Sequence, residues 1–137
     1  MSFWPNGEAA NLTSIKQLCR LNVDVLPEDT DPDLEFDYVD IGSVTLEDGI
    51  KQKERIKFET APSRARKLVR TGDVIVSTVR TYLKAVARID EADDGAVVST
   101  GFAVLRPKAS VDPSFLYRLC QSNPFVAEVQ ARSTGVG

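Results

Sequence analysis

The sequence predicts an α+β fold, with an irregular, mostly antiparallel β body and short helices at its C-terminal end. Short runs of β-branched and apolar residues recur between residues 36 and 106, and turn-forming residues separate them. The last third differs, because Asp112-Pro113 and Asn123-Pro124 each begin an apolar pattern of helical spacing. With 137 residues and no repeat or linker, the chain has the size of one compact domain, residues 1–137.

The first third is expected to hold one clear strand between loops. Residues around Ser14 can cap a short helix over 14–20, although a strand there is the alternative. Two prolines and five acidic residues make 27–35 a loop. The alternation in 36–41 predicts a strand that ends at Gly42, and a loop and a brief strand over 56–59 follow.

The middle of the chain carries the strongest strand signals. Residues 74–79 (VIVSTV) begin with three apolar β-branched residues, which favour a sheet. Gly101 interrupts a later apolar run, which indicates a bulge or a close approach of the backbone. The predicted strands in this part are 74–79, 84–89, 96–100 and 102–106, and residues 65–69 are expected to form an element that a turn closes.

Both predicted helices begin with the same signal, in which an Asp or Asn caps the helix and a proline occupies its first position. The apolar positions of the two helices are Phe115, Leu116, Leu119 and Cys120 in the first and Phe125, Val126 and Val129 in the second. The aromatic residues expected in the core are Phe36, Tyr38, Phe102, Phe115 and Phe125. Cys19 and Cys120 lack CxxC spacing and lie in apolar surroundings, so we expect buried, reduced thiols.

The composition argues against catalysis and against a membrane protein. The chain has no histidine, which removes the commonest general base and the commonest zinc ligand. A carboxylate pair such as Asp40 and Asp73 leaves a small hydrolase as a less favoured alternative. No apolar run approaches the ~20 residues of a membrane helix and no signal peptide is visible, so a cytoplasmic location is expected.

The net charge of −3 conceals a basic segment. Residues 1–50 hold 2 basic and 11 acidic residues, residues 51–88 hold 11 basic and 3 acidic, and the remainder holds 4 basic and 6 acidic. One basic face on an acidic body would attract a polyanion. The alternative is that the acidic and basic segments pair with each other on the surface, and both interpretations stay open at this point.

Binding to DNA requires cations for the phosphates and polar side chains for the base edges. The cations available for phosphates are Lys51, Lys53, Arg55, Lys57, Arg64, Arg66, Lys67 and Arg70, each of which is otherwise a solvated surface charge. Arg80 is the first choice for a base or phosphate contact, with an ion pair as the alternative, and Tyr82 and Lys84 follow. The remaining candidates are Ser77 or Thr78, of which at most one faces DNA, and Ser99, Thr100 and Gly101, which otherwise form a bulge.

Five short motifs occur in a fixed order: YVDIG (38–42), the lysine-rich approach to GDVI (72–75), STVR (77–80), VSTGFAVLRP (98–107) and the helix start D…FLY (112–117). In this order and at this spacing they resemble the target recognition domain of type I restriction-modification specificity subunits (HsdS-like), over roughly residues 36–135. Thr81 departs from the pattern, because the family often has proline there. The absence of this proline leaves the backbone of residues 80–83 less constrained.

The resemblance implies a non-catalytic subunit with two such domains, separated by long helices, each of which reads one half of a split double-stranded DNA target. Methylation and cleavage would belong to partner methyltransferase and endonuclease subunits. S-adenosylmethionine would belong to the methylating partner, so no cofactor is expected on this chain. The chain would be the N-terminal half of a longer specificity subunit, or a half-sized protein that pairs with a second half-subunit. Outside DNA binding, the alternative is a protein-interaction module with a basic face.

Overall fold

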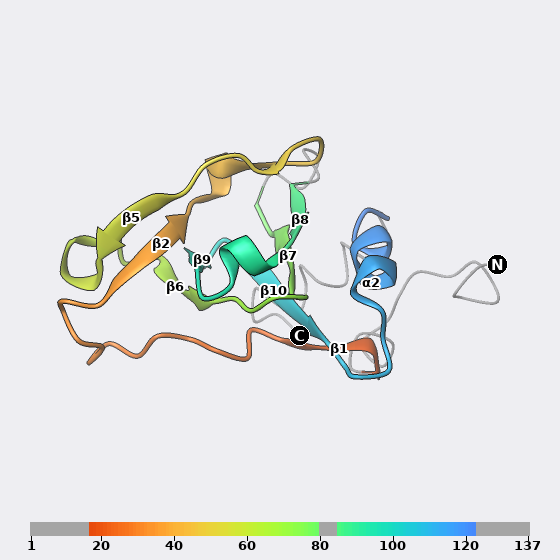
Figure 1. Cartoon of the computed structure of the whole chain (residues 1–137), viewed down its shortest axis with the longest axis horizontal. Helices are drawn as coiled ribbons and strands as arrows, with labels where there is room; N and C mark the ends of the chain where they lie inside the picture. The colour runs from red at the N-terminus through yellow and green to blue at the C-terminus, as the bar shows by residue number, and fades with distance from the viewer. Residues whose placement is uncertain (1–16, 80–84, 123–137) are drawn as a thin grey trace.

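The structure is a computed structural model that describes residues 17–79 and 85–122. Its strands form two four-stranded sheets and a small hairpin (Figure 1). Sheet A has the order β1 (Cys19–Leu21), β10 (Phe102–Pro107), β7 (Val74–Ser77) and β8 (Val86–Arg88). Sheet B has the order β5 (Glu54–Lys57), β2 (Glu35–Val39), β9 (Val97–Ser99) and β6 (Ala65–Leu68). The hairpin joins β3 (Val44–Thr45) to β4 (Gly49–Ile50).

Neighbouring strands are antiparallel in every described pair except β2 and β9, which run parallel and pair Tyr38 with Val97. Short 3-10 helices, η1 (Ile41–Ser43), η2 (Phe58–Thr60) and η4 (Glu91–Asp93), turn the chain between strands. A mostly antiparallel β body with a helix near its C-terminal end confirms the predicted α+β class.

Strand β7 lies inside sheet A, between β10 and β8, and all four of its residues are buried. Because side chains alternate along a strand, Val74 and Val76 pack in the apolar cluster that also holds Leu116 of the helix. Ile75 faces the opposite way, into a cluster that contains Val39 and Val98 of sheet B. An uninterrupted apolar run is therefore required here, because both faces of this strand exclude water.

Helix α2 (Pro113–Leu119) begins as predicted. The Asp112 side chain accepts a hydrogen bond from the N–H of Ser114 at 2.8 Å, and Pro113 occupies the first turn. Leu116 is fully buried against sheet A, and Cys120 directly after the helix is buried with it. The second predicted helix, from Pro124, lies outside the described residues.

Of the segment predicted to be a helix over 14–20, residues 17–18 are helical, whereas strand β1 occupies residues 19–20, where the strand alternative is correct. Strand β1 pairs with β10, and at its two ends the N–H of Lys108 donates to the carbonyl of Leu18 at 2.9 Å and the N–H of Asn22 donates to that of Val104 at 2.7 Å. Strand β7 ends two residues before the predicted end, because the Ser77 hydroxyl accepts the N–H of Val79 at 3.2 Å and turns the chain. Residues 14–16 lie outside the described part.

A buried ionic brace ties three segments together. Asp73 is 1% exposed and accepts hydrogen bonds from Nε and Nη2 of Arg106, at 2.9 and 3.0 Å, and from the N–H of Arg70 at 2.9 Å. Arg106 also donates through Nη1 to Asp24 at 2.8 Å. The brace joins the turn before β7, strand β10 and the segment that follows β1. Its hydrogen bonds hold the pKa of the Arg106 guanidinium above its ordinary value.

Both cysteines are buried and neither forms a disulfide, as predicted. Burial raises the pKa of the Cys19 thiol to about 12 and raises that of Cys120 well above its ordinary value. Among the described residues, none of the helices is long and apolar enough to cross a membrane.

Candidate nucleic-acid interface

The chain crosses from sheet B to sheet A through Thr100 and Gly101, which we call the β9–β10 corner. Thr78 donates to the Gly101 carbonyl through both its N–H and its hydroxyl, at 2.8 and 2.9 Å. The Gly101 N–H donates to Ser99 Oγ at 3.1 Å, and the Thr100 N–H donates to the carbonyl of Arg64 at 2.8 Å. The structure therefore brings the candidates Thr78, Thr100 and Arg64 together at one corner.

Gly101 allows helix η1 to approach the corner closely. A Cβ atom built at this position would lie 2.7 Å from Cδ1 and 3.0 Å from Cγ1 of Ile41. This contact confirms the predicted close approach of the backbone at the glycine. The irregular pairing that a bulge would produce is found instead in β6, between Ala65 and Lys67.

Lys67 lies inside the molecule, below the corner. Its side chain leaves β6 of sheet B, and Nζ donates to the carbonyl of Phe102 at 2.6 Å and to that of Thr100 at 3.4 Å. The residue is 9% exposed, and this burial lowers the pKa of its ammonium group. Such a placement argues against a direct phosphate contact by Lys67, because its cation already binds two carbonyls that flank Gly101.

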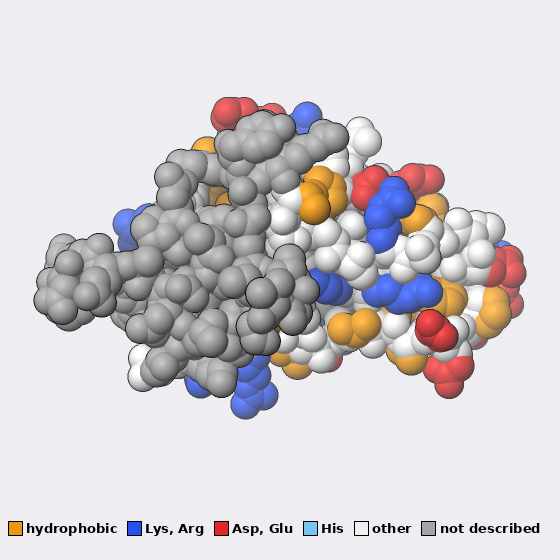
Figure 2. Space-filling view, turned by 180° about the vertical axis from the view of Figure 1, so that it is seen from behind, with side chains coloured by type: hydrophobic (Ala, Val, Ile, Leu, Met, Phe, Trp, Pro, Cys, Tyr) orange, Lys and Arg blue, Asp and Glu red, His pale blue; other side chains and the backbone are white. Residues whose placement is uncertain are grey.

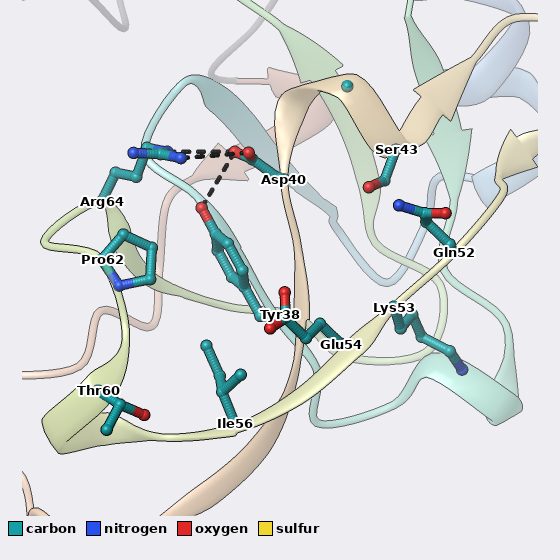
Figure 3. A pocket seen from close by; sticks show the side chains of 11 residues that line it. Tyr38, Asp40, Ser43, Gln52, Lys53, Glu54, Ile56, Thr60, Pro62 and Arg64 are labelled. Carbon is teal, nitrogen blue, oxygen red and sulfur yellow. Dashed lines mark hydrogen bonds and ion pairs between the residues drawn. The ribbon is translucent and has the colours of Figure 1, made fainter.

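A polar pocket of about 410 Å³ opens next to the corner, between β2, β5 and the start of β6 (Figure 3). At its rim, Arg64 donates to Asp40 through two parallel bonds, Nε to Oδ1 and Nη2 to Oδ2, both 3.2 Å. The Tyr38 hydroxyl donates to Oδ1 of the same carboxylate at 3.1 Å. Figure 3 shows the Tyr38 hydroxyl and the Arg64 guanidinium pointing toward Asp40 from different elements.

These contacts shift the ionisation of the three groups. The Arg64 guanidinium, as the main cause, holds the pKa of Asp40 below its ordinary value. Burial, followed by the charge of Asp40, raises the pKa of the Tyr38 phenol. At neutral pH the site therefore contains an ion pair and a protonated phenol, which is a rigid and nearly neutral arrangement of hydrogen-bonding groups.

The two other described candidates lie away from the corner. Lys53 borders the far side of the pocket, and its Nζ pairs with Asp93 at 2.7 Å. Arg66 places its guanidinium 4.7 Å from the centre of the Phe58 ring and stays half-exposed. The candidates Arg80, Tyr82 and Lys84 lie outside the described residues, as does Thr81.

Ion pairs with acidic residues compensate part of the charge of the basic segment. The exposed ion pairs of this segment join Lys53 to Asp93, Arg55 to Asp37, Arg64 to Asp40 and Arg70 to Asp94. Figure 2 accordingly shows blue side chains in small groups, with red and orange ones between them, on the described part of this face. Lys51 and Lys57 are exposed and have no ion pair with a described carboxylate. Pairing between the acidic and basic segments, one of the two interpretations of the charge pattern, thus accounts for much of it.

The sequence does not reveal the cluster of Tyr38, Asp40 and Arg64. Tyr38 is expected in the core, where its ring is indeed buried, and Asp40 enters only as half of a carboxylate pair. The spacing of two residues places Tyr38 and Asp40 on one side of an extended segment, which is a usable signal. Nothing in the spacing indicates that Arg64, from a distant segment, completes the cluster.

No model of a known protein family matches the sequence, and no curated protein matches it. Solved structures do match. A chain from a study of complex assembly and conformational transition of the type I R-M system is 37% identical, with a TM-score of 0.73 over 80% of this chain and 28% of that chain. The HsdS subunit from Thermoanaerobacter tengcongensis is 38% identical, with a TM-score of 0.65 over 77% of this chain and 30% of that chain. The present chain therefore spans less than a third of the length of each.

Proposed function

We infer that this chain, which is an HsdS-like target recognition domain, recognises a sequence in double-stranded DNA for a type I restriction-modification system. The observation that carries the inference is a 37% identity that extends over 80% of the chain together with the fold. A likeness of fold alone would say little, because one fold serves many functions. Here the identity is supported by the five motifs, which recur in the order of the family.

In this proposal the chain corresponds to one target recognition domain and reads one half of a two-part target. A second domain or half-subunit reads the other half, and partner methyltransferase and endonuclease subunits perform the chemistry. The described carboxylates support a non-catalytic role, because Asp40 and Asp73 line different pockets and each is held by an arginine. Within residues 17–79 and 85–122, no group of acidic residues and cysteines is arranged to hold a metal ion.

We propose that the β9–β10 corner and the neighbouring pocket face the DNA. Thr78 and Thr100 lie at this corner, and Arg80, Tyr82 and Lys84, which follow Val79 closely in the sequence, remain our proposed contacts. The cations proposed for the phosphates are the exposed Lys51 and Lys57, the partly buried Arg66, and Lys53, which must leave Asp93 to reach a phosphate. Lys67 contributes by holding the corner rather than by contact.

Selection from randomised duplexes tests the proposal. We expect one sequence to be enriched, and its affinity for the chain to fall steeply as salt is raised, because phosphate contacts release counterions. Equal binding to every duplex would contradict sequence recognition. Salt-sensitive binding to acidic proteins without any preference among duplexes would instead support an interaction module. Affinities of an isolated domain are expected to be low, since a single small interface makes few contacts.

A further inference from the structure

The rim of the pocket carries an exposed arginine whose side chain is already oriented. Arg64 lies in the turn directly before β6, where the N–H of the fully buried Ala65 donates to the carbonyl of Pro62 at 3.0 Å. Its own carbonyl accepts the N–H of Thr100, so the backbone is anchored on two sides. The guanidinium is then held by both oxygens of Asp40, and Tyr38 fixes that carboxylate in turn.

This orientation leaves the outer edge of the guanidinium available. Arginine has five N–H donors, and the bonds to Asp40 use the one on Nε and one on Nη2. Within residues 17–79 and 85–122, no hydrogen bond uses Nη1 or the second hydrogen of Nη2, and the side chain is 53% exposed. The end of the guanidinium therefore presents two parallel donors to the solvent, which match the O6 and N7 acceptors of guanine in the major groove.

The local charge favours a base over a phosphate as the partner of this edge. Asp40 already compensates the charge of Arg64. A phosphate group that reached the arginine would lie close to this carboxylate. A guanine edge carries no net charge, so it gains the two hydrogen bonds without that repulsion.

A second exposed arginine pair, on sheet B, is built differently. Arg55 of β5 reaches Asp37 of β2 through a single contact of 3.5 Å, with side chains 61% and 36% exposed. Such a pair leaves the guanidinium free to rotate, whereas the pair at the rim holds Arg64 in one plane. Asp37 therefore offers a matched control, because it lies three residues before Asp40 and carries the same charge.

We propose that Arg64 reads a guanine in the DNA half-site through Nη1 and Nη2, and that Asp40 is a positioning residue that aims it. The proposal rests on the proposed function and goes further, because it assigns a base to a residue that sequence reasoning places among the phosphate contacts. In this role Arg64 does not serve merely to neutralise a phosphate.

The test uses the 137-residue chain and the duplex it selects from a randomised pool, with each guanine in turn replaced by adenine. For the wild-type chain, one replacement should weaken binding about tenfold, the effect of losing one bidentate base contact. Asp40→Asn and Arg64→Lys should reduce this penalty to less than about threefold, since the first frees the guanidinium and the second removes the fork. Asp37→Asn, with the same change in charge, should retain the full penalty.

Salt titrations separate this contact from a phosphate contact. Arg64→Met should leave the slope of log affinity against log salt close to that of the wild type, whereas loss of a phosphate contact lowers the slope by about one unit. A lowered slope with an unchanged guanine penalty would overturn the proposal, as would an Asp40→Asn chain that behaves like Asp37→Asn. Should Asp40→Asn fail a thermal-unfolding check, Arg64→Lys decides alone. If the wild-type chain selects no sequence, the proposed function fails, and this inference fails with it. If the chain selects a sequence but the Arg64 variants change the penalty of no guanine replacement, only this inference is overturned.

Discussion

Lys67 donates through Nζ to the carbonyl of Phe102 at 2.6 Å, and this bond links strand β6 of sheet B to the first residue of β10 in sheet A. The two sheets also meet here through the chain itself, at Thr100 and Gly101, and through the apolar cluster that holds Val98 and Phe102. A buried ammonium group on two carbonyls has lost much of its hydration, so the bonds must compensate for that loss. We interpret Lys67 as the support of the β9–β10 corner.

Replacing Lys67 with Met should destabilise the chain by about 1–3 kcal/mol, because two carbonyls lose a charged donor while the side chain keeps a similar length. The free energy of unfolding from urea titrations measures this difference. Lys57→Met, at an exposed position without an ion pair to a described carboxylate, is the matched control and should change stability by less than about 0.5 kcal/mol. Equal stability of the two variants would show that the buried bonds contribute nothing net.

The same residue predicts a dependence on alkaline pH. Burial lowers the pKa of Lys67 below its ordinary value of 10.5, so between the two values the unfolded chain binds more protons at this position than the folded chain does. Stability contributed by this group therefore rises as pH increases from the folded pKa toward 10.5. The wild-type chain should gain stability relative to Lys67→Met over this window. Urea titrations of both chains at several pH values test the sign, and a relative loss on the wild-type side would contradict it.

Gly101→Ala should destabilise the chain by about 1–3 kcal/mol, because the added methyl group lies too close to Ile41. Ile41→Val in the same chain removes Cδ1, the nearest atom, and should restore part of the loss. The double variant is thus expected to be more stable than the sum of the two single changes allows. Gly42→Ala, where a Cβ meets nothing within 4 Å, serves as the comparison. Strict additivity would mean that the contact is relieved at no cost.

Asp73→Asn should be among the most damaging single changes, at about 3 kcal/mol or more, because it leaves Arg106 without the buried member of its pair. Asp24→Asn removes the half-exposed partner of the same arginine and should cost clearly less. Thermal unfolding of both variants gives the ranking. The reverse order would show that the brace depends on its exposed carboxylate.

For DNA binding, Arg80→Ala should relax selectivity among duplexes, whereas Lys53→Ala should weaken all duplexes alike and lower the salt slope by about one unit. The reason for Lys53 is electrostatic, since its cation can exchange Asp93 for a phosphate. Salt titrations on selected and scrambled duplexes separate the two effects. If Lys53→Ala leaves the slope unchanged, its ion pair persists on DNA and the residue makes no phosphate contact.

Features that depend on neighbouring residues could be predicted from the sequence, and features that depend on distant ones could not. The cap formed by Asp112 and the first position of Pro113 are local, so the start of helix α2 is readable. The local helix signal holds for residues 17–18, but the strand character of residues 19–21 depends on β10, which is far away in the sequence. The β-branched run of β7 is an exception, because burial on both faces marks a strand wherever its partners lie.

The candidate site shows the same division. Thr78, Thr100 and Gly101 were identified by their position at strand ends, and the corner does bring them together. Charge alone does not distinguish a buried lysine from a solvated one, so the sequence places Lys67 among the candidate phosphate contacts although its side chain is buried. The carboxylates that compensate the basic segment come from other strands and loops. Their pairing is a property of the folded chain.

The parallel pairing of β2 with β9 has a consequence for how the chain acquires its structure. Tyr38 cannot pair with Val97 until the residues between them have been synthesised, whereas β5 can pair with β2 earlier. Closing so long a loop costs entropy before any contact rewards it, which slows folding. During synthesis, β2 and β5 therefore form at most an incomplete sheet, in which β9 does not yet cover Phe36 and Tyr38. A chain interrupted before β9 is expected to remain unfolded and to be a substrate for proteolysis.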